Sequence, residues 1–166
     1  MTTNRVVLAL GDDVSTDTIY PGRFMATVLP SETPQYAFAD DAEFNAKVRG
    51  RLLPAGSVIV GGQNFGCGSS REQAASCLRG PELVVVARGF ARIFLQNAIN
   101  LGLRTIICPT VFASEGDELE ITATEVINTA TRQRFPIVPL PGARQAIVDA
   151  GGLIPYARQL LVAART

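Results

Sequence analysis

The chain has 166 residues, of which 47% are hydrophobic and 18% charged, a composition that predicts one globular domain over residues 1–166 with a full-sized core. Fifteen basic residues balance fifteen acidic ones, no apolar run has the length of a membrane span, and the N-terminus lacks a signal-peptide layout. We therefore expect a cytoplasmic protein with neither nucleic acid nor membrane as a partner. The chain has no histidine, which excludes a Ser-His-Asp triad, a Cys-His pair and most zinc sites within it.

The first third of the chain predicts one strand and a long connection. An apolar strand over Arg5–Leu10 ends at Gly11. Residues 21–56 contain four prolines and predict a long loop with one helix near Tyr36–Val48. Loops of this length in compact domains are usually functional or mobile.

The middle of the chain alternates apolar strands with amphipathic segments. In chain order these predict strand, helix, strand, helix and strand over Ser57–Gly61, Arg71–Leu78, Leu83–Ala87, Phe90–Leu101 and Leu103–Cys108. This order predicts a parallel core sheet with right-handed crossovers.

The last third changes character. Short antiparallel strands are expected over 118–123, 125–129 and 134–140, followed by helices over 141–150 and 153–164. The fold class is therefore α/β, with a parallel core sheet plus short antiparallel strands.

The glycine-rich turn before the second predicted helix is the most informative segment. It carries Ser69, Ser70 and Arg71 where the first N–H groups of that helix have no internal partner, so an anion is favoured there. Arg71 adds a planar fork suited to a carboxylate or phosphate. A purely structural alternative stays open, because Ser69 and Glu72 fit an S-x-x-E capping box in which Ser69 caps the helix.

The three cysteines do not predict a metal site or a disulfide. Cys67, Cys77 and Cys108 lack paired C-x-x-C spacing, and core packing is expected for the last two. Cys67 lies in the glycine turn next to a helix start and is a minor candidate for a reactive thiol.

Four blocks, in order along the chain, resemble the small-subunit signature of the aconitase superfamily, and within it that of the isopropylmalate dehydratases. They are Asp12–Pro21 (DDVSTDTIYP), Gly62–Ala74 (GQNFGCGSSREQA), Ala91–Leu103 (ARIFLQNAINLGL) and Gly151–Tyr156 (GGLIPY). The resemblance implies an aconitase domain-4-like, swivelling β/β/α domain that works with a large catalytic subunit. That partner is expected to carry the [4Fe–4S] cluster, with no cofactor and no metal held by this chain.

The same resemblance implies a hydro-lyase that moves a hydroxyl between neighbouring carbons of a small 2-hydroxy dicarboxylate. Carried over by position, Ser69 is similar to the serine that acts as the catalytic base, and Asp17 to the N-terminal active-site aspartate. Ser70 and Arg71 match positions that bind a substrate carboxylate. Gln73 stands where many relatives have His.

The segment 20–28 matches the loop that reads the variable substituent of the substrate. Phe24, Met25 and Ala26 offer an apolar edge suited to an alkyl group, whereas relatives that accept an extra carboxylate place Arg at the position of Ala26. Arg23 is near enough in sequence to reverse this preference.

The leading hypothesis is the small subunit of an enzyme that isomerises 2- and 3-isopropylmalate in leucine biosynthesis. Two alternatives stay open: a small subunit of a homoaconitase-type or dimethylmalate-type dehydratase, and a stand-alone carboxylate-binding module.

Overall fold

The structure is a computed structural model that describes residues 3–164. Its centre is a sheet with the strand order β4-β3-β2-β1-β5-β6-β7. The strands are β1 (Thr3–Ala9), β2 (Val58–Gly61), β3 (Val84–Ala87), β4 (Arg104–Ile107), β5 (Glu118–Ile121), β6 (Glu125–Asn128) and β7 (Arg134–Pro136). The helices are α1 (Thr16–Ile19), α2 (Ala42–Arg49), α3 (Glu72–Arg79), α4 (Arg92–Leu101), α5 (Gly142–Asp149) and α6 (Leu153–Ala163), with 3-10 turns η1 (Gly22–Phe24) and η2 (Thr33–Tyr36).

The sheet has a parallel half and an antiparallel half that meet at β1. Strand β1 pairs parallel with β2, which pairs parallel with β3 and then β4. On its other side β1 pairs antiparallel with β5, and β6 and β7 continue the antiparallel half. The predicted parallel core and the short antiparallel strands are therefore confirmed. All three antiparallel strands are shorter than expected. The difference is largest for the last one, which ends at Pro136, after which only Val138 rejoins the sheet in a bridge to Ile107.

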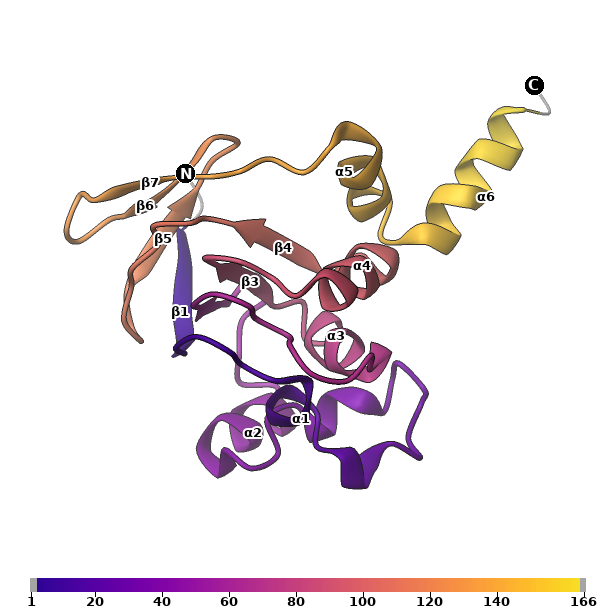
Figure 1. Ribbon diagram of the computed structural model, residues 1–166, viewed down its shortest axis with the longest axis horizontal. Helices are drawn as coiled ribbons and strands as arrows, with labels where there is room; N and C mark the ends of the chain where they lie inside the picture. The colour runs from indigo at the N-terminus through magenta and orange to yellow at the C-terminus, as the bar shows by residue number, and fades with distance from the viewer. Residues whose placement is uncertain (1–2, 165–166) are drawn as a thin grey trace.

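The two faces of the parallel half have separate cores. Side chains alternate along β2, so that Ile59 faces a core cluster shared with the helices while Val58 and Val60 face a second cluster. The second cluster includes Leu119 and Phe135, because the antiparallel strands curl over that face. Figure 1 shows this arrangement, with α1 to α4 on one side of the sheet and β5 to β7 at its far end.

The connection over residues 21–56 is more ordered than the sequence predicts. The one helix expected near Tyr36–Val48 is present as the shorter α2, which is capped by the side chain of Asp41, and the connection also forms the 3-10 turns η1 and η2. Asn45 is buried and donates to the carbonyls of Gln35 and Ala37 at 3.0 and 2.8 Å, which holds the turn against α2. Over residues 3–164, no helix combines the length and the apolar character needed to cross a membrane.

Candidate active site

Three loops meet where β1, β2 and β3 end. The loop after β2 lies between the other two, since Gly62 N donates to Gly11 O and Phe65 N to Gly89 O, both at 2.9 Å. Further along, Ser15 and Cys67 form a parallel bridge. The carboxyl ends of parallel strands are where α/β proteins usually place their ligands, so this edge is where the predicted site residues converge.

A one-turn helix that the sequence analysis missed positions Asp17. Ser15 caps α1 by accepting from Thr18 N at 3.1 Å. The buried Thr16 donates from its hydroxyl to Ser69 O at 3.0 Å, and its N–H donates to Cys67 O at 2.7 Å. These bonds fix α1 beside the glycine-rich turn and bring Asp17 next to Arg71.

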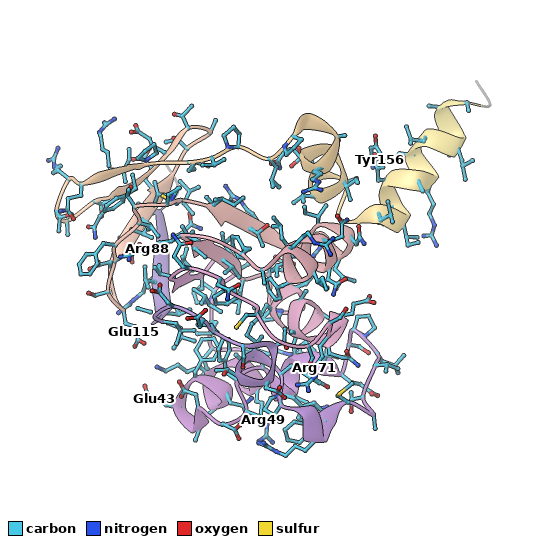
Figure 2. All side chains as sticks on the ribbon, in the orientation of Figure 1. Glu43, Arg49, Arg71, Arg88, Glu115 and Tyr156 are labelled. Carbon is cyan, nitrogen blue, oxygen red and sulfur yellow. The ribbon has the colours of Figure 1, made fainter. Side chains whose placement is uncertain are left out.

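Arg71 forms the centre of the site. Its Nη1 donates to Asp17 Oδ1 and to Tyr20 O, the latter at 3.3 Å, and its side chain is 12% exposed whereas that of Asp17 is 58% exposed. A Cβ on Gly22 would lie 3.2 Å from Nη2, so glycine leaves the guanidinium room there. Figure 2 shows Arg71 between α1 and α3. Within residues 3–164, neither Nη2 nor Nε has a hydrogen-bond partner, and Nε is buried.

The two serines are exposed and are not helix caps. Helix α3 begins at Glu72, its N-cap position is occupied by Arg71, and no side chain caps it. The capping-box interpretation of Ser69 is therefore wrong. Neither serine hydroxyl makes a hydrogen bond within the part of the chain that the structure describes, whereas the Ser69 carbonyl accepts from Arg71 N at 2.9 Å. The backbone at Ser69 is therefore held by hydrogen bonds, while the hydroxyls of Ser69 and Ser70 are available to a ligand.

Glycine is required at position 66 of the turn. Gly66 has φ +83°, and a Cβ there would overlap the ring of Phe94 on α4. The turn is consequently packed directly onto α4, which fixes the direction in which residues 67–71 leave the sheet.

The loop over residues 22–28 lies beside this centre. Arg23 pairs with Asp40 at 2.5 Å and lies over the ring of Phe24, 4.6 Å from its centroid. Phe24 stacks on Tyr36 with ring centroids 4.1 Å apart. Arg23 is thus directed to Asp40 and not to Arg71, while Met25 and Ala26 are exposed.

Two contacts that sequence reasoning missed hold this loop. The buried Tyr20 donates from its hydroxyl to the carbonyls of Phe24 and Thr27 at 3.1 and 3.3 Å. Burial raises the pKa of Tyr20, which keeps the hydroxyl protonated as a donor. Gln73 Nε2 lies 3.5 Å from Met25 O and links the loop to α3.

The cysteines do not assemble into a ligand set. Cys77 and Cys108 are buried in the two different core clusters, as expected for packing residues. Burial raises the pKa of both thiols, that of Cys108 to about 11. Cys67 is half-buried in the turn, with its thiol 3.4 Å from Asp13 O. Residues 3–164 contain no cluster of His, Cys, Asp or Glu suited to a metal ion, and the cysteines of this described part do not fit an iron–sulfur cluster.

Comparison with known proteins gives a consistent family. The Aconitase C-terminal domain family matches residues 33–111. The 3-isopropylmalate dehydratase small subunit of Methanosarcina mazei is 43% identical over 155 residues, which cover 91% of this chain and 93% of the relative. The isopropylmalate/citramalate isomerase small subunit of Methanocaldococcus jannaschii is 41% identical over 159 residues and 92% of each chain.

The fold agrees with a solved relative. The crystal structure of 3-isopropylmalate dehydratase from Methanocaldococcus jannaschii superposes with a TM-score of 0.86 at 38% identity, over 99% of this chain and 98% of the other. The resemblance seen in the four sequence blocks is thereby confirmed, and the chain belongs to the family of 3-isopropylmalate dehydratase small subunits, built on the aconitase C-terminal domain.

Proposed function

We propose that this chain is the small subunit of a hydro-lyase that interconverts 2- and 3-isopropylmalate in leucine biosynthesis, active with a large subunit. One observation carries the proposal: Ser69, Ser70 and the Arg71–Asp17 pair lie together on an exposed edge of a chain of this family. The arrangement combines an anion-binding guanidinium with a free hydroxyl two residues away.

Arg71 is the proposed binding group for one substrate carboxylate. Asp17 and the Tyr20 carbonyl hold Nη1, which orients the planar fork and leaves Nη2 without a partner in residues 3–164. The Ser70 hydroxyl provides a second donor to the same carboxylate. Asp17 balances the charge of Arg71 before the substrate arrives and keeps the guanidinium in position afterwards.

Ser69 is the proposed base. As an alkoxide it takes a proton from the carbon next to the hydroxyl-bearing carbon. The hydroxyl group receives a proton from an acid, which we place on the large subunit, and leaves as water to give the unsaturated diacid. In the second half Ser69 returns its proton to the carbon that carried the hydroxyl, while water adds its hydroxyl to the carbon that lost the proton and gives its remaining proton back to the acid. The isomer forms and both groups are regenerated. The start of α3 and the Arg71 guanidinium stabilise the negative charge that Ser69 carries.

The remaining parts of the site must come from a second polypeptide. Asp17, Ser69 and Ser70 are exposed on this chain, and a serine base works in a site from which water is excluded. The proposed large subunit closes this face and holds the [4Fe–4S] cluster, which when bound supplies a Lewis-acid iron for the substrate hydroxyl.

A second substrate is favoured by one relative. The Methanocaldococcus jannaschii protein is named for isopropylmalate and citramalate, which differ in the size of one alkyl group. Met25 and Ala26 are exposed beside the site and offer no charge to an additional carboxylate. We therefore expect the assembled enzyme to hydrate alkyl-substituted maleates and to discriminate against carboxyalkyl ones.

The substitution Ala26→Arg tests that expectation. With the large subunit present, the ratio of kcat/KM for a carboxyalkyl maleate to that for isopropylmaleate should rise at least about tenfold, because a buried carboxylate gains a charged partner. An unchanged ratio would remove the argument that this loop selects an alkyl group.

The substitution Ser69→Ala tests the function itself. Because the hydroxyl has no partner in the described chain, unfolding in urea should change by no more than about 0.5 kcal/mol. Turnover by the assembled enzyme should fall by about 10²–10⁴-fold. Ser31→Ala, at an exposed serine outside the site, is the matched control and should retain activity. Near-normal turnover by the Ser69 variant would reject the proposed base.

A further inference from the structure

Strand β4 leaves one of its two edges open. It is the last strand on the parallel side of the sheet, so its regular pairing is with β3 alone. Cys108 N donates to Ala87 O at 2.8 Å, and in a parallel ladder alternate residues make such bonds to one neighbour. The backbone N–H and C=O groups of Thr105 and Ile107 therefore point away from β3, toward the open edge.

The chain between β7 and α5 closes only one end of this open edge. Val138 N donates to Ile107 O at 2.8 Å, in the bridge that rejoins the sheet. Figure 1 shows the connection continuing past β4 to α5. Before the bridge, no segment of residues 3–164 pairs with the edge at Thr105. The outward N–H and C=O of Thr105 are thus left without a backbone partner in the described chain.

A cavity of about 370 Å³ lies at this open part of β4. Because side chains alternate along a strand, Arg104 lies on one face of the sheet and Thr105 on the other. Ile121 and Ile137, which belong to the core on the face of Arg104, line the cavity there. Helix α5, which packs on α4, adds Val148. The cavity therefore surrounds the free edge, with the backbone of Thr105 between its two sides.

The polar groups of the cavity wall favour an anion. The Thr105 hydroxyl is buried and makes no hydrogen bond within residues 3–164, which costs free energy until a ligand or solvent partner is found. Arg104 is exposed and forms no ion pair in the described part of the chain. Together with the Thr105 N–H these groups can all donate, and none of the described residues that line the cavity is acidic.

The size and the remaining wall of the cavity favour a compact aliphatic molecule. Much of that wall is formed by branched aliphatic side chains, those of Ile106, Ile121, Ile137, Leu140 and Val148. Sites for small ligands span about 300–1,000 Å³, so this cavity suits a ligand at the small end of the range. An added peptide strand would need a longer open edge, and the bridge at Val138 ends this one.

We propose that this β4-edge cavity binds a small carboxylate with a branched aliphatic body. The carboxylate accepts hydrogen bonds from the N–H and hydroxyl of Thr105 and pairs with the Arg104 guanidinium, while the alkyl group lies among the isoleucines. The candidate active site lies at the carboxyl ends of β1 to β3, whereas Arg104 begins β4, so the two sites are separate. The inference does not depend on the proposed reaction.

Titration of the full chain with isocaproate, followed in amide NMR spectra, tests the proposal. The amide signals of Thr105 and Ile107 should shift saturably with a Kd of about 1 mM or tighter, the scale expected for so small a ligand. Acetate, which lacks the aliphatic body, and isocaproamide, which lacks the charge, should each bind at least about tenfold more weakly. No saturable shift of these two amides, or equal binding of either control compound, would overturn the proposal.

Substitution of Arg104 tests the charged part of the site. Arg104→Gln should weaken isocaproate binding at least about tenfold, because the carboxylate loses its charged donor. Arg158→Gln is the matched control, since Arg158 is an exposed arginine on α6, outside the cavity, and forms no ion pair in the described part of the chain. Equal affinities of the two variants would contradict the assigned carboxylate position.

Substitution of Thr105 tests the buried hydroxyl. Thr105→Val should weaken binding at least about threefold without lowering the midpoint of urea denaturation, because the hydroxyl has no partner to lose within residues 3–164. Thr105→Ser keeps the hydroxyl and should retain binding. If Thr105→Val binds isocaproate as tightly as the wild type, the hydroxyl is not part of the site and the assignment is wrong.

Discussion

The glycine turn over residues 66–71 and the loop over residues 22–29 lie side by side but are held very differently. In the turn, Gly66 N and Cys67 N both donate to Val14 O, at 2.7 and 3.2 Å, and the Phe94 ring packs on Gly66. The loop depends on the Tyr20 hydroxyl and on the stack of Phe24 against Tyr36, and leaves Met25, Val28 and Leu29 exposed.

This difference matches the two tasks proposed for the site. We propose that each substrate presents a carboxylate to the turn, where a fixed geometry favours the reaction. The loop is proposed to face the part of the substrate that varies, and its few anchors would allow residues to be exchanged without disturbing the turn. Substitutions in the turn should therefore lower stability or kcat/KM, whereas substitutions that release the loop should mainly raise KM.

The largest expected effect is on the turn. Gly66→Ala should lower the free energy of unfolding by about 2–6 kcal/mol, because strain at positive φ adds to a clash with Phe94. Gly68→Ala is the matched control: its φ is +92°, but a Cβ there would lie 3.5 Å from the nearest atom, so about 1–3 kcal/mol is expected. Urea denaturation measures both, and equal losses would show that packing on α4 does not hold the turn.

A smaller effect is expected when Arg71 is replaced by a residue that has the same charge but a different shape. Arg71→Lys should lower kcat/KM by about 10- to 100-fold, since loss of charged hydrogen bonds costs about 1.5–3 kcal/mol. Arg134→Lys changes an exposed pair with Glu125 on β7 and β6 and serves as the control, with no loss expected. Full activity in the Arg71 variant would mean that the guanidinium only stabilises the fold.

The smallest effect is expected for Tyr20, whose hydroxyl anchors the loop. Tyr20→Phe removes both hydroxyl bonds and should cost about 1 kcal/mol of stability, raising KM more than it lowers kcat. Tyr36→Phe keeps the stack on Phe24 and removes a hydroxyl that has no partner within residues 3–164, so it should be neutral. If both variants raise KM equally, the Tyr20 hydroxyl is not what orders the loop.

Sequence patterns were sufficient where the structure is local or fully apolar. The strands over 57–61 and 83–87 are short β-branched runs, and the structure confirms them as β2 and β3, buried on both faces. The motif blocks also brought Asp17, Ser69, Ser70 and Arg71 into one site, although their roles remain predictions.

Non-local contacts explain what the sequence did not predict. Helix α1 spans only Thr16–Ile19, too short for a helical period, and it is held by the Thr16 hydroxyl on the Ser69 carbonyl. The same contact places the Ser69 backbone outside α3, which is why an apparent capping box is not one. Likewise, Arg23 pairs with Asp40, a partner that no spacing in the sequence suggests.

The position of β1 between the two halves has a consequence for how the chain acquires its structure. Strand β1 precedes both of its partners in the sequence, and it pairs with β2 on one edge and with β5, much later in the sequence, on the other. Such distant pairings slow folding, because chain entropy is lost before the contacts form. An N-terminal truncation that removes β1 would therefore separate the parallel half of the sheet from the antiparallel half. It would disrupt the candidate active site as well, and would not merely shorten one edge of the sheet.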